Sequence, residues 1–304
     1  MKALIKIGIF SILLGLIIMY KDDIVELYNV LLVKFSKPDE LIKNEYYKKD
    51  DFKFVKNTND FRPQNKQDLY NIYYTVINSG MKKYSFYCST KYDKCINDVK
   101  NIASDRTLLS NINNYVHPFN SFSDIETEYN NYGKITIKLN HTYTEEQIKM
   151  INEKVKDLEK ELFKDEKLSE VEKINLVHDY IINNTKYDSD RSDLNIIKYK
   201  SDIAYGPLFE NYAICGGYSD LMAIFLEDLN IKNYKVSTDK HVWNVVKING
   251  NWLHIDLTWD DPITSDGSNI LDHKFLLINT KKLLEIEKTQ HNFNDKIYKE
   301  LVTK

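Results

Sequence analysis

The 304-residue sequence lacks an excess of basic charge, since its formal net charge is -3 and 29% of its residues are charged. Domains that bind nucleic acid usually carry clustered lysine and arginine, so no nucleic-acid partner is expected. Glycine (9) and proline (5) are scarce, and no internal repeat or low-complexity segment is present. Hydrophobic residues make up 42% of the chain, which is enough to bury a core and argues against global disorder.

The N-terminus lacks an apolar run of the roughly 20 residues that a standard transmembrane helix needs. Lys2 and Lys6 precede a shorter run, 7–20, with no small-x-small cleavage site and no cysteine for lipidation. This pattern predicts export, with 1–20 either a cleaved signal peptide or a retained membrane anchor whose body lies outside. The two lysines favour the anchor, because they lie on the side that the positive-inside rule requires. A buried core helix is the alternative, but it would be apolar all round.

Cysteine is also scarce, with only three residues in the chain. Cys88 and Cys95 bracket a short polar loop, and we expect them to form a disulfide outside the cytosol, with two unpaired thiols as the alternative. Two sulfurs without a nearby histidine do not suit a metal site. Cys215 is then the odd cysteine, and an unpaired cysteine in an exported protein requires an explanation.

The rest of the chain divides by pattern into three parts: a linker or stalk over 21–45, a small α/β domain over 46–140, and a larger domain over 141–304. In the small domain, helices are expected over 68–81 and 96–112, and strands over 84–88 and 134–139. In the larger domain, capping boxes at Thr144 and Ser169 begin two amphipathic helices. Together these elements predict an α+β fold.

Cys215-Gly216-Gly217 begins a third helix of the larger domain. The unsatisfied N–H groups and the macrodipole at a helix start favour a thiolate there. Gly216 and Gly217 have no side chain, which predicts close approach of a substrate backbone. A buried, inert core cysteine is the alternative for Cys215.

Asn249-Gly250 predicts a two-residue type I′ hairpin between strands over 241–248 and 251–257. In that register Trp243 faces Asp256, so Asp256 is the diagonal neighbour of His241, within reach of a hydrogen bond. The opposite face of the hairpin is apolar, and a slip by one residue would expose it. His241 and Asp256 therefore qualify as a base and its orienting carboxylate for the Cys215 thiol, with purely structural roles as the alternative.

These residues resemble the motifs of the transglutaminase-like superfamily over about 145–280. The resemblance rests on a helix over 172–180 and on the following three runs: Asn211-Tyr212-Ala213-Ile214-Cys215-Gly216-Gly217-Tyr218, His241-Val242-Trp243-Asn244 and Asp256-Leu257-Thr258-Trp259. It implies a papain-like cysteine-proteinase (transglutaminase core) fold, a Cys215–His241–Asp256 triad, no metal and no required cofactor. One departure is Asn211, where the family often has glycine; asparagine tolerates positive φ better than most residues.

Three other features have two interpretations each. His178-Asp179 resembles the pair of metal-dependent phosphohydrolases, but a pair on a helix surface is favoured because no further metal-spaced cluster accompanies it. Asp260-Asp261-Pro262 is expected to form a turn rather than to line the cleft. Trp243 either helps to shape the substrate site or packs in the core, and the sequence favours neither role.

The sequence as a whole predicts an exported enzyme that acts on protein or peptide amides at the cell surface, through a thioester on Cys215. Water as the second nucleophile would make it an amidase or protease, and a lysine amine would make it a cross-linking transglutaminase. A catalytically silent surface module that keeps the fold for binding is the main alternative. An intracellular protein with an apolar membrane tether is another.

Overall fold

The structure is a computed structural model that describes residues 18–165, 167–262 and 270–302. It combines helices with antiparallel sheets, which confirms the predicted α+β class. Most of the predicted signal or anchor segment, residues 1–17, lies outside the described residues. In the described ranges no helix is both long and apolar enough to cross a membrane.

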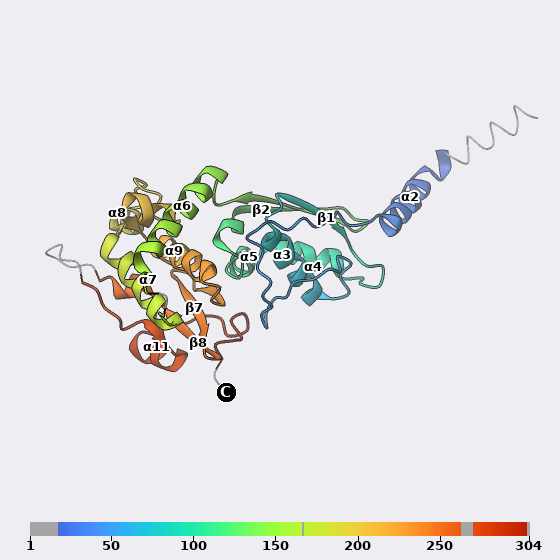
Figure 1. Cartoon of the computed structure of the whole chain (residues 1–304). Helices are drawn as coiled ribbons and strands as arrows, with labels where there is room; N and C mark the ends of the chain where they lie inside the picture. The colour runs from blue at the N-terminus through green and yellow to red at the C-terminus, as the bar shows by residue number, and fades with distance from the viewer. Residues whose placement is uncertain (1–17, 166, 263–269, 303–304) are drawn as a thin grey trace, which may run out of the picture.

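Helix α2 (Lys21–Phe35) projects away from the rest of the chain, so the first part of the predicted stalk is helical (Figure 1). Val33 is its one buried residue. Eight of its apolar side chains are at least 42% exposed: Ile24, Val25, Leu27, Tyr28, Val30, Leu31, Leu32 and Phe35. Contiguous exposed apolar surface of this kind marks a contact with a membrane or another protein.

The N-terminal part of the body is built on a three-stranded antiparallel sheet with strand order β1–β3–β2. Its elements are α3 (Lys66–Ser79), β1 (Lys83–Tyr87), α4 (Cys95–Ser104), α5 (Arg106–Asn113), η1 (Pro118–Asn120), β2 (Phe122–Tyr129) and β3 (Lys134–His141). The single helix predicted over 96–112 is wrong: Asp105 leaves helical geometry and its side chain caps α5 by accepting from the N–H of Leu108. Strand β2 was not predicted, because it is a largely exposed edge strand whose apolar and polar residues do not alternate.

The C-terminal part packs helices against a four-stranded antiparallel sheet with strand order β6–β7–β8–β9 (Figure 1). Its elements are α6 (Glu145–Leu162), α7 (Glu170–Asn184), β4 (Lys186–Tyr187), α8 (Ser189–Leu194), η2 (Gly206–Glu210), β5 (Tyr212–Ala213), α9 (Cys215–Asp228), β6 (Asn233–Ser237), β7 (Val242–Ile248), β8 (Asn251–Ile255), α10 (Leu257–Asp260), β9 (Leu276–Ile278) and α11 (Thr280–Ile286). Both predicted capping boxes, at Thr144 and Ser169, are present. Helix α9 contacts α7 and both β6 and β7, so it lies at the centre of this part.

The β7–β8 hairpin has the predicted register, with Ile248 opposite Asn251 and Val246 opposite Leu253. The strands are shorter than predicted, because β8 ends at Ile255 and the chain then turns into α10. The cause is Asp256, whose side chain accepts from the N–H of Trp259 and caps that helix. His241 and Asp256 therefore lie just beyond the strands, at the same end of the hairpin.

Both faces of the four-stranded sheet are buried. On one face, Val246, Ile248 and Ile255 pack with α7 and α9 in one core cluster. On the other face, Trp243 and Val245 belong to a second cluster, which also contains buried residues of the N-terminal part such as Phe52 and Ile137. The N-terminal part thus covers a sheet face that would otherwise meet water. The predicted boundaries at 46, 140 and 141 stay predictions.

The structure contains the predicted disulfide between Cys88, just after β1, and Cys95, the first residue of α4. Their Cα atoms are 5.9 Å apart and seven positions separate them in sequence. The bond ties the end of the sheet to the start of a helix. Cys215 is the one free cysteine.

Replacing both Cys88 and Cys95 with alanine should lower the free energy of unfolding by about 2 kcal/mol, the loop-closure contribution of so short a loop. Urea denaturation of the oxidised chain measures this, and Cys215→Ser is the control that should leave stability nearly unchanged. Alkylation of the denatured, unreduced chain should add one group. Three groups would show that the disulfide does not form.

Candidate functional site

Cys215 is the first residue of α9, and its side chain is half-buried rather than enclosed. The glycines after it allow the first turn of α9 to lie against the chain's own backbone. A Cβ at Gly217 would stand 2.3 Å from the carbonyl oxygen of Ser201, and one at Gly216 would stand 2.6 Å from that of Asp202. These contacts explain the glycines by packing, and their predicted role in substrate approach stays a prediction.

The turn before the cysteine has the backbone that the sequence suggested. Asn211 has a φ of 61° and a ψ of 26°, which is left-handed geometry. Its side-chain amide also donates to the carbonyl oxygen of Asn184 at 2.8 Å, which ties the turn to the end of α7. Asparagine is therefore an adequate replacement for glycine at this position.

His241 and Asp256 lie together, as the hairpin register predicts. The Nε2 atom of His241 is 2.5 Å from Oδ2 of Asp256, and both side chains are nearly completely buried. Cys215 also lies close enough for its side chain to help raise the pKa of His241. The imidazole thus bonds the carboxylate and lies near the thiol.

The charges around His241 stabilise its protonated form. Burial alone disfavours the imidazolium, but the charge and hydrogen bond of Asp256, together with the nearby side chain of Cys215, raise the pKa of His241 to about 10. Burial likewise disfavours the Asp256 carboxylate, yet His241 and His291 hold the pKa of Asp256 well below its usual range. At neutral pH these shifts favour an imidazolium beside a carboxylate.

Trp243 lies behind the imidazole and not at the surface. Its ring stacks on that of His241 with centroids 5.5 Å apart, and its indole N–H donates to Nδ1 of His254 at 2.9 Å. Only 1% of the residue is exposed. Its contact with His241 is therefore a positioning one, and the predicted contact with substrate stays a prediction.

His291 is a buried member of the site that the sequence did not reveal. Its Nε2 lies 2.8 Å from Oδ2 of Asp256, and its Nδ1 lies 2.9 Å from Oε2 of Glu287. His291 thus stands between two carboxyl groups, one of which belongs to the triad. The spacing of Glu287 and His291 is visible in the sequence, but nothing local connects either residue to Asp256. The pair also lies outside the resemblance at about 145–280.

The prediction of a helix-surface pair at His178 and Asp179 is wrong for His178, which is completely buried. Its two ring nitrogens face Asp179 and Asp260. Asp260 and Asp261 stand where a turn was expected, at the end of the short helix α10. Asp261 accepts from the hydroxyl of Tyr218, and its burial raises the pKa of its carboxyl group to about 6.

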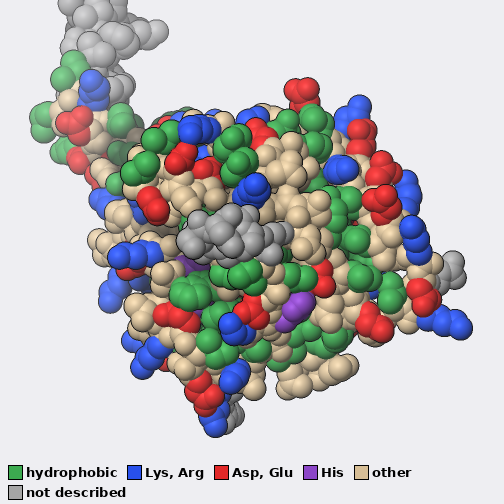
Figure 2. Space-filling view, turned by 90° about the vertical axis from the view of Figure 1, so that its left-hand side faces the viewer, with side chains coloured by type: hydrophobic (Ala, Val, Ile, Leu, Met, Phe, Trp, Pro, Cys, Tyr) green, Lys and Arg blue, Asp and Glu red, His purple; other side chains and the backbone are tan. Residues whose placement is uncertain are grey.

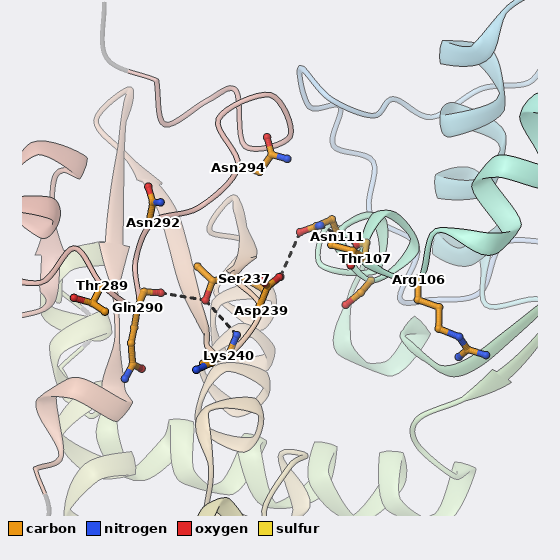
Figure 3. Close-up of a pocket in the computed structure, with 12 residues that line it drawn as sticks. Arg106, Thr107, Asn111, Ser237, Asp239, Lys240, Thr289, Gln290, Asn292 and Asn294 are labelled. Atoms are coloured by element: carbon orange, nitrogen blue, oxygen red, sulfur yellow. Dashed lines mark hydrogen bonds between the residues drawn. The ribbon is translucent and has the colours of Figure 1, made fainter.

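A cleft of about 760 Å³ lies between the N-terminal and C-terminal parts, beside the chain segments that carry His241 and His291 (Figure 3). Helix α5 supplies one wall and the β6–β7 turn faces it, with the segment 289–294 completing the lining. The lining is polar: Arg106, Thr107, Ser110, Asn111, Ser237, Thr238, Asp239, Lys240, Thr289, Gln290, Asn292 and Asn294. The sequence did not indicate this cleft, because its walls come from distant parts of the chain.

Comparison with known proteins gives a match for most of the C-terminal part. Residues 153–284 match the family described as a transglutaminase-like domain, which confirms the resemblance seen in the sequence motifs. No curated protein matches the chain. Two solved structures are similar: a TGase (18% identity, TM-score 0.34) and a candidate cysteine protease from Cytophaga hutchinsonii (16% identity, TM-score 0.27). The match covers 45% of this chain and 45% of the TGase, and 51% of this chain and 69% of the protease.

Replacing Asp256 with asparagine should lower the pKa of His241 from about 10 to below the ordinary 6.5, because the charge that raises it is lost while burial remains. NMR titration of a histidine-labelled chain, which has seven histidines, measures this midpoint. Asp261→Asn is the matched control: it changes a buried carboxyl of the same turn that bonds Tyr218 instead. An unchanged His241 midpoint in Asp256→Asn would contradict the pairing.

Proposed function

We propose that this protein is an exported cysteine enzyme that transfers acyl groups from protein or peptide amides through a thioester on Cys215. The observation that carries the proposal is the place of the His241 imidazole, which lies near Cys215 and 2.5 Å from Asp256. Nucleophile, base and orienting carboxylate in that order are the requirements of this chemistry. The transglutaminase-like domain at 153–284 supports the same class of enzyme.

The reaction follows from these three side chains. The Cys215 sulfur, whose proton is already held by the His241 imidazolium, attacks the amide carbonyl, and the tetrahedral intermediate then loses the amine, which takes that proton. The Cys215 N–H at the start of α9 is a suitable donor to the oxyanion. Water or a primary amine next attacks the thioester, gives its proton to His241 and releases the thiolate. Asp256 holds the imidazole in orientation throughout, and His291 holds Asp256 from its other side.

The shape and chemistry of the surface support a polypeptide substrate. The cleft beside the site carries amides, hydroxyls and charges of both signs, which suit hydrogen bonds to a peptide backbone. Charges of both signs are also interspersed on the face shown in Figure 2, where the described residues form no broad area of one sign. A folded protein of either charge could therefore approach this face without strong repulsion.

Two features support placement outside the cytosol with attachment to a membrane. The disulfide between Cys88 and Cys95 is of a kind that persists in oxidising compartments. The exposed apolar side chains of α2 continue the apolar character of the segment before it, so a retained N-terminal anchor is favoured over a cleaved signal peptide. The substrate is accordingly proposed to be a surface protein or peptide.

The decisive experiment incubates the full chain with a library of glutamine-containing and other peptides, with and without a biotinylated primary amine. Mass spectrometry should detect an acyl group on Cys215, and should show either hydrolysed peptide or peptide joined to the amine. His241→Gln should slow acylation by about 10²–10⁴-fold, the contribution of a positioned general base.

Cys215→Ala is expected to abolish the adduct, and His117→Gln is the control. His117 is also buried, and burial lowers the pKa of its ring to about 3, so it is neutral at pH 7, and it lies away from the proton transfer. A wild-type chain that forms no adduct with any peptide would instead identify the domain as a binding module that has kept the fold.

A further inference from the structure

We propose a divalent-metal site, separate from Cys215, formed by His178 and Asp179 of α7 and His273 of the segment before β9. This inference is independent of the proposed acyl transfer. One ligand atom from each residue lies within 4.8 Å of the others. Nδ1 of His178 is 3.0 Å, and Nε2 of His273 is 2.8 Å, from the same oxygen, Oδ1 of Asp179.

These separations are close to those around a bound ion. Zinc bonds to histidine nitrogen and carboxylate oxygen measure about 2.0–2.2 Å, which at tetrahedral angles puts neighbouring ligand atoms about 3.3 Å apart. An ion bound to Asp179 and either histidine therefore needs the N···O distance to lengthen by only about half an ångström. The two histidine nitrogens lie within 4.8 Å of each other. Without an ion, a single carboxylate oxygen serves two imidazole rings.

Asp260 orients the ring of His178, which is the strongest sign that the site is built for a ligand. Its Oδ2 lies 3.2 Å from Nε2 of His178, so a proton on Nε2 would leave Nδ1, which faces Oδ1 of Asp179, to bind a metal in place of a proton. Metal-binding histidines almost always donate their second N–H to such a partner. The side chains of both His178 and Asp260 are completely buried.

The same residue also holds the backbone on either side of His273. Oδ1 of Asp260 accepts from the N–H of Phe275 at 2.9 Å, and its carbonyl oxygen accepts from the N–H of Asp272 at 3.0 Å. One buried residue thus sets the ring of His178 and the chain that carries His273. The three proposed ligands are held in place by contacts that do not involve an ion.

The ligand set indicates which ion it would bind. Two imidazoles and one carboxylate suit zinc and neighbouring borderline ions, whereas calcium and magnesium prefer oxygen alone. The side chains of Asp179 and His273 are 36% and 47% exposed, so water can reach a fourth position. An open position of this kind allows the ion to exchange with solvent.

Zinc titration tests the proposal on the full chain in a Cys215→Ala background, which removes the free thiol as a competing ligand. Isothermal titration calorimetry near pH 7.5, with the bound metal counted by elemental analysis, should give one Zn²⁺ per chain. His273→Gln changes an exposed side chain and should preserve the fold while lowering the affinity at least tenfold. Asp260→Asn should weaken binding 10–100-fold, the usual effect of losing a partner of a ligand.

His141→Gln is the matched control, because His141 is a partly buried histidine that bonds the carbonyl oxygen of Gly80 and lies outside the cluster. It should bind zinc as the parent does. Zinc should also raise the Tm of the parent and not that of His273→Gln. The proposal would be overturned if the parent chain took up no zinc, or if His273→Gln bound zinc as tightly as the parent. The three side chains would then be connected by hydrogen bonds alone.

Discussion

The buried carboxylate of Asp256 is the constraint on which the site depends. It is 1% exposed, and one of its oxygens accepts from both His241 and His291 while the other accepts from the N–H of Trp259. A buried charge is tolerated only when it is paired and fully hydrogen-bonded, so these partners are obligatory. These bonds connect three segments through Asp256: the end of the hairpin, the start of α10 and residues 287–291. All three lie around the imidazole of His241.

The turn that begins at Asp256 connects most of the C-terminal part. Asp256 bonds His241, Asp260 bonds His178 of α7, and Asp261 bonds Tyr218 of α9. Three acidic side chains in and beside α10 thus bond His241 at the end of the sheet, helix α7, and helix α9, which carries the nucleophile. Because each contact is buried, displacement of the turn would leave several charged groups without partners at once. Rigidity of this kind is what a catalytic constellation requires from its surroundings.

The parts of the fold and site that the sequence predicted well are those with local causes. Asn249-Gly250 determines the register of the hairpin, and capping boxes determine where two helices begin. Predictions failed where a side chain competed with the local pattern. Asp105 split an expected helix and Asp256 ended an expected strand, each by capping a new helix. The prediction for His178 failed for a different reason: its buried partner Asp260 is 82 residues away in the sequence.

The sequence by itself determined the order and chemistry of the candidate site: an unpaired cysteine at a helix start, and a histidine and an aspartate at one end of a hairpin. These features rest on spacing, turn chemistry and helix capping, which act over a few residues. Only the tertiary structure decided that His291 and Glu287 stand behind Asp256, that α5 forms a wall of the cleft, and that Asp260 holds both His178 and the chain around His273. Those contacts join segments tens of residues or more apart, and they arise because buried polar groups must find partners wherever the packed chain places them.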